Sequence, residues 1–153
     1  MLDQYYYSKA DELEELAIDK RVSASHLAAW YADFLIVMHD RLMVLTPNHI
    51  VMNDVRARIE ALRLAGVDNI DKEQRDSSLV MLWRVHDTKK AEDEVLAAYA
   101  RAAICCFAGD KEWEESNADS ETPIYYLFLY LVVFGSEALD RFYDFLKNKI
   151  ACF

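Results

Sequence analysis

The chain has 153 residues, of which 54% are hydrophobic and 29% charged, so it has enough apolar side chains for one sizeable core. Its 27 acidic and 17 basic residues give a formal net charge of −10, which disfavours nucleic acid as a partner because phosphates would be repelled. Only 3 Gly and 2 Pro are present, too few for a turn-rich β-sandwich or a glycine-loop nucleotide fold. We therefore expect an all-α fold, a compact bundle of about six to seven helices that forms a single domain over residues 1–153.

The N-terminus and the apolar runs indicate a protein without a membrane partner. The opening sequence MLDQYYYSKADELEEL lacks the basic start and apolar stretch of a signal peptide. The longest apolar run, residues 124–134, is shorter than the roughly 20 residues that span a bilayer. The odd number of cysteines, Cys105, Cys106 and Cys152, and their apolar neighbours favour reduced side chains in the core. We expect a cytoplasmic location.

The first two expected helices carry apolar residues at helical spacing. The first extends from about residue 3 or 8 to residue 20 and turns Tyr5 toward the core, while its acidic residues face water. Ser23 or Ser25 then caps a second helix that continues to about Leu45 and includes it in the buried face. The breadth of that apolar face is typical of a central helix with neighbours on more than one side.

A proline and a glycine delimit the third expected helix. Thr46 and Pro47 end the preceding helix and start this one, because proline suits the first helical position. Ile50 belongs to its inward face, and three arginines to its outward face. Gly66 is the expected C-terminal stop, since glycine readily adopts the left-handed backbone that ends many helices.

The fourth and fifth expected helices are joined by a polar pair of residues. The fourth covers about residues 72–86. Asp87 or Thr88 then caps the fifth, which ends at Gly109. The fifth helix is rich in small residues, so neighbouring helices can approach it closely.

An acidic segment, residues 111–121 (KEWEESNADSE), precedes the last two expected helices. Pro123 starts a sixth helix that is apolar on every side, which predicts burial in the middle of the domain. Its β-branched and aromatic residues leave a strand open as the alternative. Gly135 ends this element, and Ser136 with Glu137 begins the last helix, which runs to about residue 149.

The acidic segment is the strongest candidate for a binding surface. Its charge keeps it out of a core, and its tryptophan supplies an apolar anchor in an exposed connector. We expect a partner-binding site made of Glu112, Trp113, Glu114, Glu115, Asp119 and Glu121. The carboxylates would complement a basic protein, and tryptophan is a frequent hot-spot residue at interfaces.

Tyrosines form a second candidate surface feature. Tyr5 to Tyr7 cover three directions on a helix, so at least one ring is expected to be exposed, while most other aromatic residues are expected in the core. Exposed tyrosine beside carboxylates is a common interface composition.

These features favour a stoichiometric protein-binding module. Small size and strong acidity fit an immunity protein or inhibitor that neutralises a basic partner, with a bacterial toxin as the specific case. An inhibitor of a nucleic-acid-handling complex that mimics phosphate charge is a close variant. A helical scaffold or assembly subunit, in the form of a homodimer, is one alternative.

No catalytic residue, cofactor or metal ligand is assigned from the sequence. Glycine-rich phosphate loops, GxSxG, HExxH and CxxC are all missing. His39-Asp40 and His86-Asp87 bring together metal-binding residue types. Neighbouring residues on a helix diverge by about 100°, however, so each pair alone makes a poor chelate.

One carboxylate pattern points to an enzyme as the other alternative. Glu112 and Glu115 are three residues apart, as are Glu137 and Asp140, and such pairs share one face of a helix. This ExxE…ExxD spacing resembles that of all-α nucleotide pyrophosphohydrolases of the MazG type. The resemblance covers only these four residues. It implies that their carboxylates bind Mg²⁺, which activates water against a nucleoside triphosphate.

Overall fold

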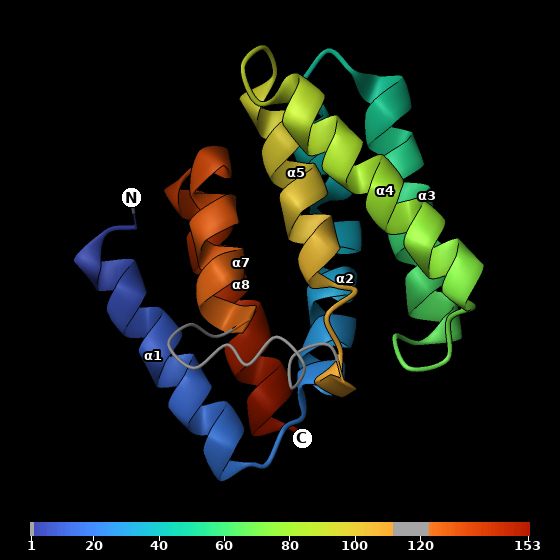
Figure 1. Cartoon of the computed structure of the whole chain (residues 1–153). Helices are drawn as coiled ribbons and strands as arrows, with labels where there is room; N and C mark the ends of the chain where they lie inside the picture. Colours follow the sequence, from blue (N-terminus) through green and yellow to red (C-terminus); the bar gives the residue numbers. More distant parts are fainter. Residues whose placement is uncertain (1, 112–122) are drawn as a thin grey trace.

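The computed structural model describes residues 2–111 and 123–153, and every regular element in these ranges is helical (Figure 1). The elements are α1 (Gln4–Asp19), α2 (Ala24–Met43), α3 (His49–Ala65), α4 (Lys72–Lys89), α5 (Glu94–Cys105), α7 (Pro123–Leu131), the short 3₁₀ helix η1 (Val132–Phe134) and α8 (Ser136–Ala151). The expected all-α bundle is therefore confirmed. Across the described residues, every helix is too short or too polar to span a lipid bilayer.

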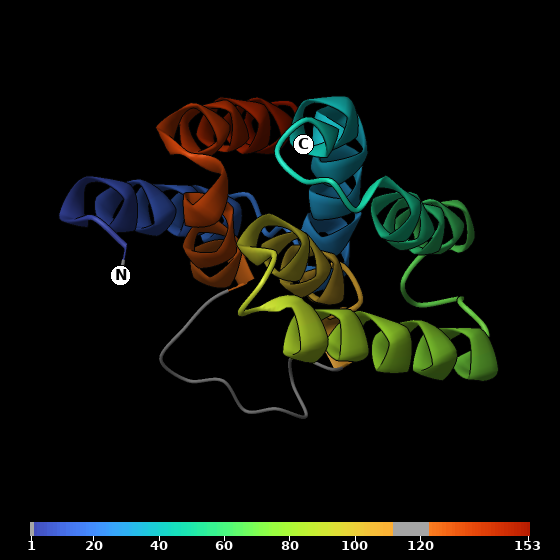
Figure 2. The same ribbon diagram turned by 90° about the horizontal axis from the view of Figure 1, so that it is seen from above.

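The helix α5 lies at the centre of the bundle. It contacts α2, α3, α4 and α7, and Figure 2 shows α1, α7 and α8 on one side of it and α3 and α4 on the other. Its buried residues are mostly small: Leu96, Ala97, Ala98, Tyr99, Ala100, Ala102 and Ala103. An alanine face lets several helix backbones approach one helix, as the sequence predicts.

An aromatic cluster joins α2, α7 and α8. The ring centroid of Phe142 lies 5.1 Å from those of Phe34 and Phe128 and 6.0 Å from that of Tyr31. All four side chains are buried. Burial of a large apolar side chain contributes roughly 1.5–3 kcal/mol, so this cluster holds the three helices together.

Helix ends that depend on local capping agree with the sequence. Ser23 Oγ accepts the backbone N–H of His26 at 3.1 Å and so caps α2. Gly66 ends α3 with a φ of +87°, and Gly135 separates η1 from α8 with a φ of +100°. Both glycines adopt a backbone conformation that other residues rarely tolerate. Ser136 is the first residue of α8, as expected.

The expected boundary between the fourth and fifth helices is wrong. α4 continues through Asp87 and Thr88, and Thr88 Oγ1 donates to the backbone carbonyl of Arg84 at 2.7 Å instead of capping a new helix. Asp93 caps α5, since its Oδ1 accepts the backbone N–H of Leu96 at 3.1 Å. The helix also ends four residues before the expected Gly109.

Four side chains that the sequence places in the core are exposed. Tyr5, Leu45 and Ile50 have exposed fractions of 58%, 49% and 80%, and Cys152 is exposed beyond the end of α8. All four lie near helix ends. Periodicity predicts which face of a helix is apolar, but it does not show how far along that face the neighbouring helices reach.

The element from Pro123 to Phe134 is helical, so the strand alternative is wrong. Its burial is also less complete than expected. Ile124, Leu127, Phe128 and Leu131 are buried on one face, whereas the tyrosines of the other face are half-buried. The apolar run therefore combines a core face with an aromatic face near the surface.

Asp93 also joins the α2–α3 turn to the start of α5. The buried carboxylate accepts hydrogen bonds from the Thr46 hydroxyl and from Asn48 Nδ2, the latter at 2.5 Å. The expectation that Pro47 would be the first residue of α3 is wrong. Thr46 is held toward Asp93, and α3 begins at His49. Burial acts to raise the pKa of Asp93, but the hydrogen bonds from Thr46, Asn48 and the Leu96 N–H outweigh it and lower that pKa.

Tyr31 and Tyr99 provide a matched test of buried hydroxyl groups. Tyr31→Phe should leave the free energy of unfolding unchanged or raise it by about 1 kcal/mol, because its buried hydroxyl has no hydrogen-bond partner among the described residues. Tyr99→Phe should lower it by about 1–3 kcal/mol, because the Tyr99 hydroxyl lies 3.0 Å from His39 Nδ1 in the core. Urea denaturation measures the free energy of unfolding of both variants. Equal losses of stability in Tyr31→Phe and Tyr99→Phe would contradict the different hydrogen bonding of the two hydroxyls.

Asp93→Asn should lower the free energy of unfolding by about 1–3 kcal/mol at neutral pH, because it removes the charge that strengthens three hydrogen bonds. The folded-state pKa is depressed, so this stabilisation is present above the unfolded-state pKa of about 3.9 and is lost as the pH falls through the folded-state pKa. Urea denaturation over a pH series should therefore show the wild type and the variant converging in acid.

The exposed Asp54 on α3 provides the control for that series. Asp54→Asn should change the free energy of unfolding by less than about 0.5 kcal/mol at each pH. A difference between Asp93→Asn and wild type that does not narrow on acidification would contradict the role given to the Asp93 carboxylate.

Candidate functional site

All six expected partner-binding residues lie outside the described residues. Glu112, Trp113, Glu114, Glu115, Asp119 and Glu121 fall within residues 112–122. Their role therefore stays a prediction. The residues on both sides of this stretch are described, and they form the candidate site.

The chain that leads into the acidic segment is attached to the N-terminus of α2. Asp110 Oδ1 accepts the backbone N–H of Ala24 at 2.8 Å and that of Ser25 at 3.4 Å. In return, the backbone N–H of Asp110 donates to Ser25 Oγ at 3.0 Å. A carboxylate at a helix N-terminus satisfies free N–H groups and interacts well with the helix dipole. The acidic segment therefore starts from a fixed point.

Gly109 permits this close approach. A Cβ atom there would lie 3.0 Å from Ser25 Oγ and 3.1 Å from both Asp68 Oδ1 and Val67 Cγ1. Ser25 Oγ also donates to Asp68 Oδ1 at 3.0 Å. Three distant parts of the chain meet here: the start of α2, the α3–α4 loop and the residues that precede the acidic segment.

Tyrosines follow the acidic segment in the chain, where α7 begins. Tyr7 of α1 contacts Tyr125, with ring centroids 5.1 Å apart; Tyr125 lies 5.8 Å from Tyr126, and Tyr126 lies 6.5 Å from Tyr130. We call these four residues the tyrosine strip. Tyr7 is exposed and the other three are half-buried. Pro123 is the first residue of α7, so Tyr125 lies in the first turn of the helix that follows the acidic segment in the chain.

Arg101 extends the strip from α7 to α4. Its Cζ lies 4.6 Å from the ring centroid of Tyr130 and 4.3 Å from that of Trp83, and its guanidinium donates to the Tyr130 hydroxyl. Burial raises the pKa of Tyr130, and the positive charge of Arg101 opposes that shift. Tyr, Trp and Arg are the residue types that dominate binding energy at protein interfaces.

Sequence reasoning anticipated part of this surface. It identified an exposed ring among Tyr5 to Tyr7, and Tyr7 is exposed. It missed the contribution of Tyr130, Arg101 and Trp83, which come from three helices. The four-residue spacing of Tyr126 and Tyr130 is the signal that could have indicated one shared helix face.

Two members of the expected carboxylate pattern are described, and both have partners. Glu137 Oε1 lies 2.9 Å from Arg141 Nη2 and 3.4 Å from Arg41 Nη1. Asp140 Oδ1 accepts the hydroxyl of Tyr6 at 2.9 Å. These contacts tie the start of α8 to α2 and α1, and they occupy oxygens that a metal ion would need.

The other two members of that pattern, Glu112 and Glu115, lie outside the described residues, so the four-carboxylate hypothesis stays a prediction. Within residues 2–111 and 123–153, no group of three or more His, Cys, Asp or Glu side chains is placed to hold a metal ion.

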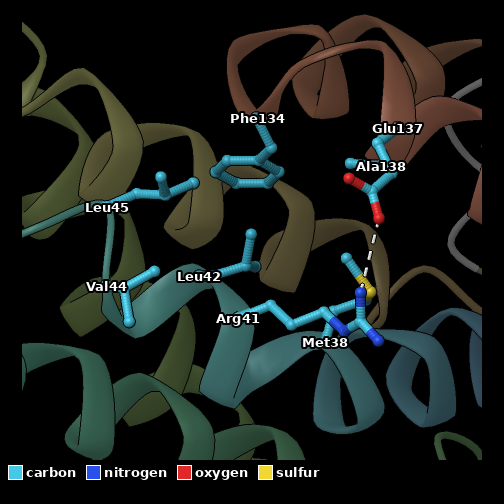
Figure 3. Close-up of a pocket in the computed structure, with 8 residues that line it drawn as sticks. All are labelled: Met38, Arg41, Leu42, Val44, Leu45, Phe134, Glu137 and Ala138. Carbon is cyan, nitrogen blue, oxygen red and sulfur yellow. Dashed lines mark hydrogen bonds and ion pairs between the residues drawn. The ribbon is translucent and has the colours of Figure 1, made fainter.

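A cavity of about 430 Å³ lies between the C-terminal end of α2 and the start of α8 (Figure 3). Its walls are largely apolar and include Leu42, Leu45 and Phe134. The Arg41–Glu137 ion pair, at 3.4 Å, lies along one side. Because these two charges neutralise each other, the cavity offers apolar contact and no evident catalytic group.

The described histidines and cysteines of the interior have structural roles. His39 is buried, with Nδ1 3.0 Å from the Tyr99 hydroxyl and Nε2 3.1 Å from Asn53 Oδ1. Burial raises the pKa of the Cys105 thiol to about 12 and also raises that of Cys106. Both thiols therefore stay protonated at neutral pH, which makes them poor nucleophiles.

Comparisons with protein-family models, with curated proteins and with solved structures found no match to this chain.

Proposed function

We propose that this protein is a stoichiometric binding module that neutralises a basic protein partner, as an immunity protein or inhibitor does, with a bacterial toxin as the specific case. The observation that carries the proposal is the proximity along the chain of a dense acidic segment and the tyrosine strip. The first supplies long-range attraction, and the second supplies apolar contact area.

The acidic segment concentrates negative charge in a short stretch. Residues 111–121 contain five carboxylates and one lysine, a net charge of −4 out of −10 for the whole chain. At physiological salt such a charge acts over about 8 Å, which is enough to steer a basic surface toward it. Asp110, which directly precedes the segment, is hydrogen-bonded to the start of α2.

The tyrosine strip supplies apolar contact area, which charge alone does not provide. Rings in contact lose little conformational freedom on binding, and each aromatic side chain can bury a large area. The strip lies on α1 and α7, two helices that pack against each other. A partner drawn to the acidic segment would therefore meet aromatic residues that follow it directly in the chain.

Charge reversal of Glu112, Glu114 and Glu115 to Lys should slow association with the partner roughly tenfold or more at low salt, because steering depends on local charge. The partner is first captured from the native host with the intact chain. Surface plasmon resonance then measures association and dissociation rates at several salt concentrations. The dissociation rate should change less than the association rate.

The control for this charge reversal carries the same change in net charge on other helices. Asp54→Lys, Glu73→Lys and Asp144→Lys alter exposed residues of α3, α4 and α8. This control should retain most of the association rate. If both triple variants bind with wild-type kinetics, or lose the same amount, the acidic segment is not the steering surface.

Tyr7→Ala should raise the dissociation rate roughly five- to thirty-fold while changing the association rate little, as expected for loss of an interface anchor worth about 1–2 kcal/mol. Ile18→Ala is the matched control, because Ile18 is an exposed apolar residue of the same helix outside the strip. Similar dissociation rates for the two variants would contradict a role for the strip.

A further inference from the structure

A second cavity, of about 210 Å³, lies between the C-terminal end of α4, α5 and α7. Three basic side chains line it, namely His86, Lys90 and Arg101, together with one carboxylate, Glu94. The remaining wall is mostly apolar and includes Leu129 and Val133. This basic lining contrasts with the net charge of −10 of the whole protein.

Arg101 is held in place by rings and not by an acid. Its guanidinium lies against Trp83 and Tyr130, at 4.3 and 4.6 Å from their ring centroids, and donates one hydrogen bond to the Tyr130 hydroxyl. No carboxylate among the described residues forms an ion pair with it. A guanidinium has five N–H donors, so most remain available. The residue is half-buried, which makes an unpaired charge costly and a bound anion favourable.

The other basic groups differ in how available they are. His86 Nδ1 lies 3.0 Å from Asp87 Oδ1, so this ring is already partnered. Lys90, at the end of α4, is exposed and forms no ion pair within residues 2–111 and 123–153. Arg101 and Lys90 together therefore provide two positive charges, against which Glu94 places one negative charge.

The size and charge of the cavity restrict the ligand. At about 30 Å³ per water molecule, it has room for roughly seven waters, which matches a small organic molecule. The planar fork of arginine matches a carboxylate with two parallel hydrogen bonds. Glu94 and the acidic protein disfavour a second negative charge on the ligand, and the apolar wall favours a hydrocarbon body.

We propose that this cavity binds a small monocarboxylate, with Arg101 as the carboxylate-binding residue, Lys90 as a supporting charge and the apolar wall around the hydrocarbon part. This proposal does not depend on the protein-binding function proposed above, although Tyr130 belongs both to the wall of this cavity and to the tyrosine strip.

Benzoate is the probe for the test, with the intact protein at constant ionic strength. The signal is the indole N–H resonance of Trp83, assigned with Trp83→Phe, because this ring contacts Arg101. Saturable shifts are expected at millimolar benzoate, a range suited to a small ligand. Arg101→Gln should weaken binding roughly tenfold or more, and Arg101→Lys, which keeps the charge but loses the fork, should also weaken it.

Arg84→Gln is the matched control. Arg84 is an exposed cation next to Trp83 in the sequence but does not line the cavity, so this variant should keep wild-type affinity. Lys90→Gln is a second test variant in case changes at Arg101 disturb folding, because Lys90 is exposed. It should lower the affinity for benzoate roughly threefold, since it removes one supporting charge. Circular dichroism confirms that each variant is folded.

Three results would overturn the proposal. The first is no saturable shift with benzoate. The second is equal weakening by Arg84→Gln and by the Arg101 or Lys90 variants, which would indicate a general effect of charge. The third is that inorganic phosphate, largely a dianion at slightly alkaline pH, binds as tightly as benzoate, because Glu94 and the apolar wall should favour a monoanion with a hydrocarbon body.

Discussion

Close packing around α5 is the constraint on which the rest of the structure depends. This short helix contacts α2, α3, α4 and α7, and most of its buried side chains are alanines. Small side chains allow backbones to approach, so one helix determines how four others are placed. The position of Arg101 between Trp83 of α4 and Tyr130 of α7 is a direct result, because its own helix lies between theirs.

Two carboxylates form hydrogen bonds near the two ends of α5. Asp93 caps the start of α5 and binds the α2–α3 turn, while Asp110 binds the start of α2 just after α5 ends. Among the described residues, both act through N–H or O–H donors and not through ion pairs, so part of the acidity of the chain has a structural role. The residue that precedes the acidic segment is therefore anchored to α2, and the segment is followed in the chain by α7.

The surface formed by the tyrosine strip, Arg101 and Trp83 combines features that are useful for recognition. The tyrosine strip joins α1 to α7, and Arg101 and Trp83 continue it across α5 to α4. Aromatic rings and one held guanidinium provide contact area with little entropy to lose, whereas the carboxylates act at longer range. The cavity lined by Arg101 and Lys90 has a local excess of positive charge, in contrast to the net negative charge of the chain.

The sequence by itself determined the helical class and the helix ends at Ser23, Gly66 and Gly135, because caps and glycine turns act over a few residues. It also identified the acidic segment and predicted at least one exposed ring among Tyr5 to Tyr7. Only the tertiary structure decided the Asp93 contacts, since Thr46 and Asn48 are 47 and 45 residues away in the chain. The arrangement of Trp83, Arg101 and Tyr130 likewise depends on how helices pack, which helical periodicity does not specify.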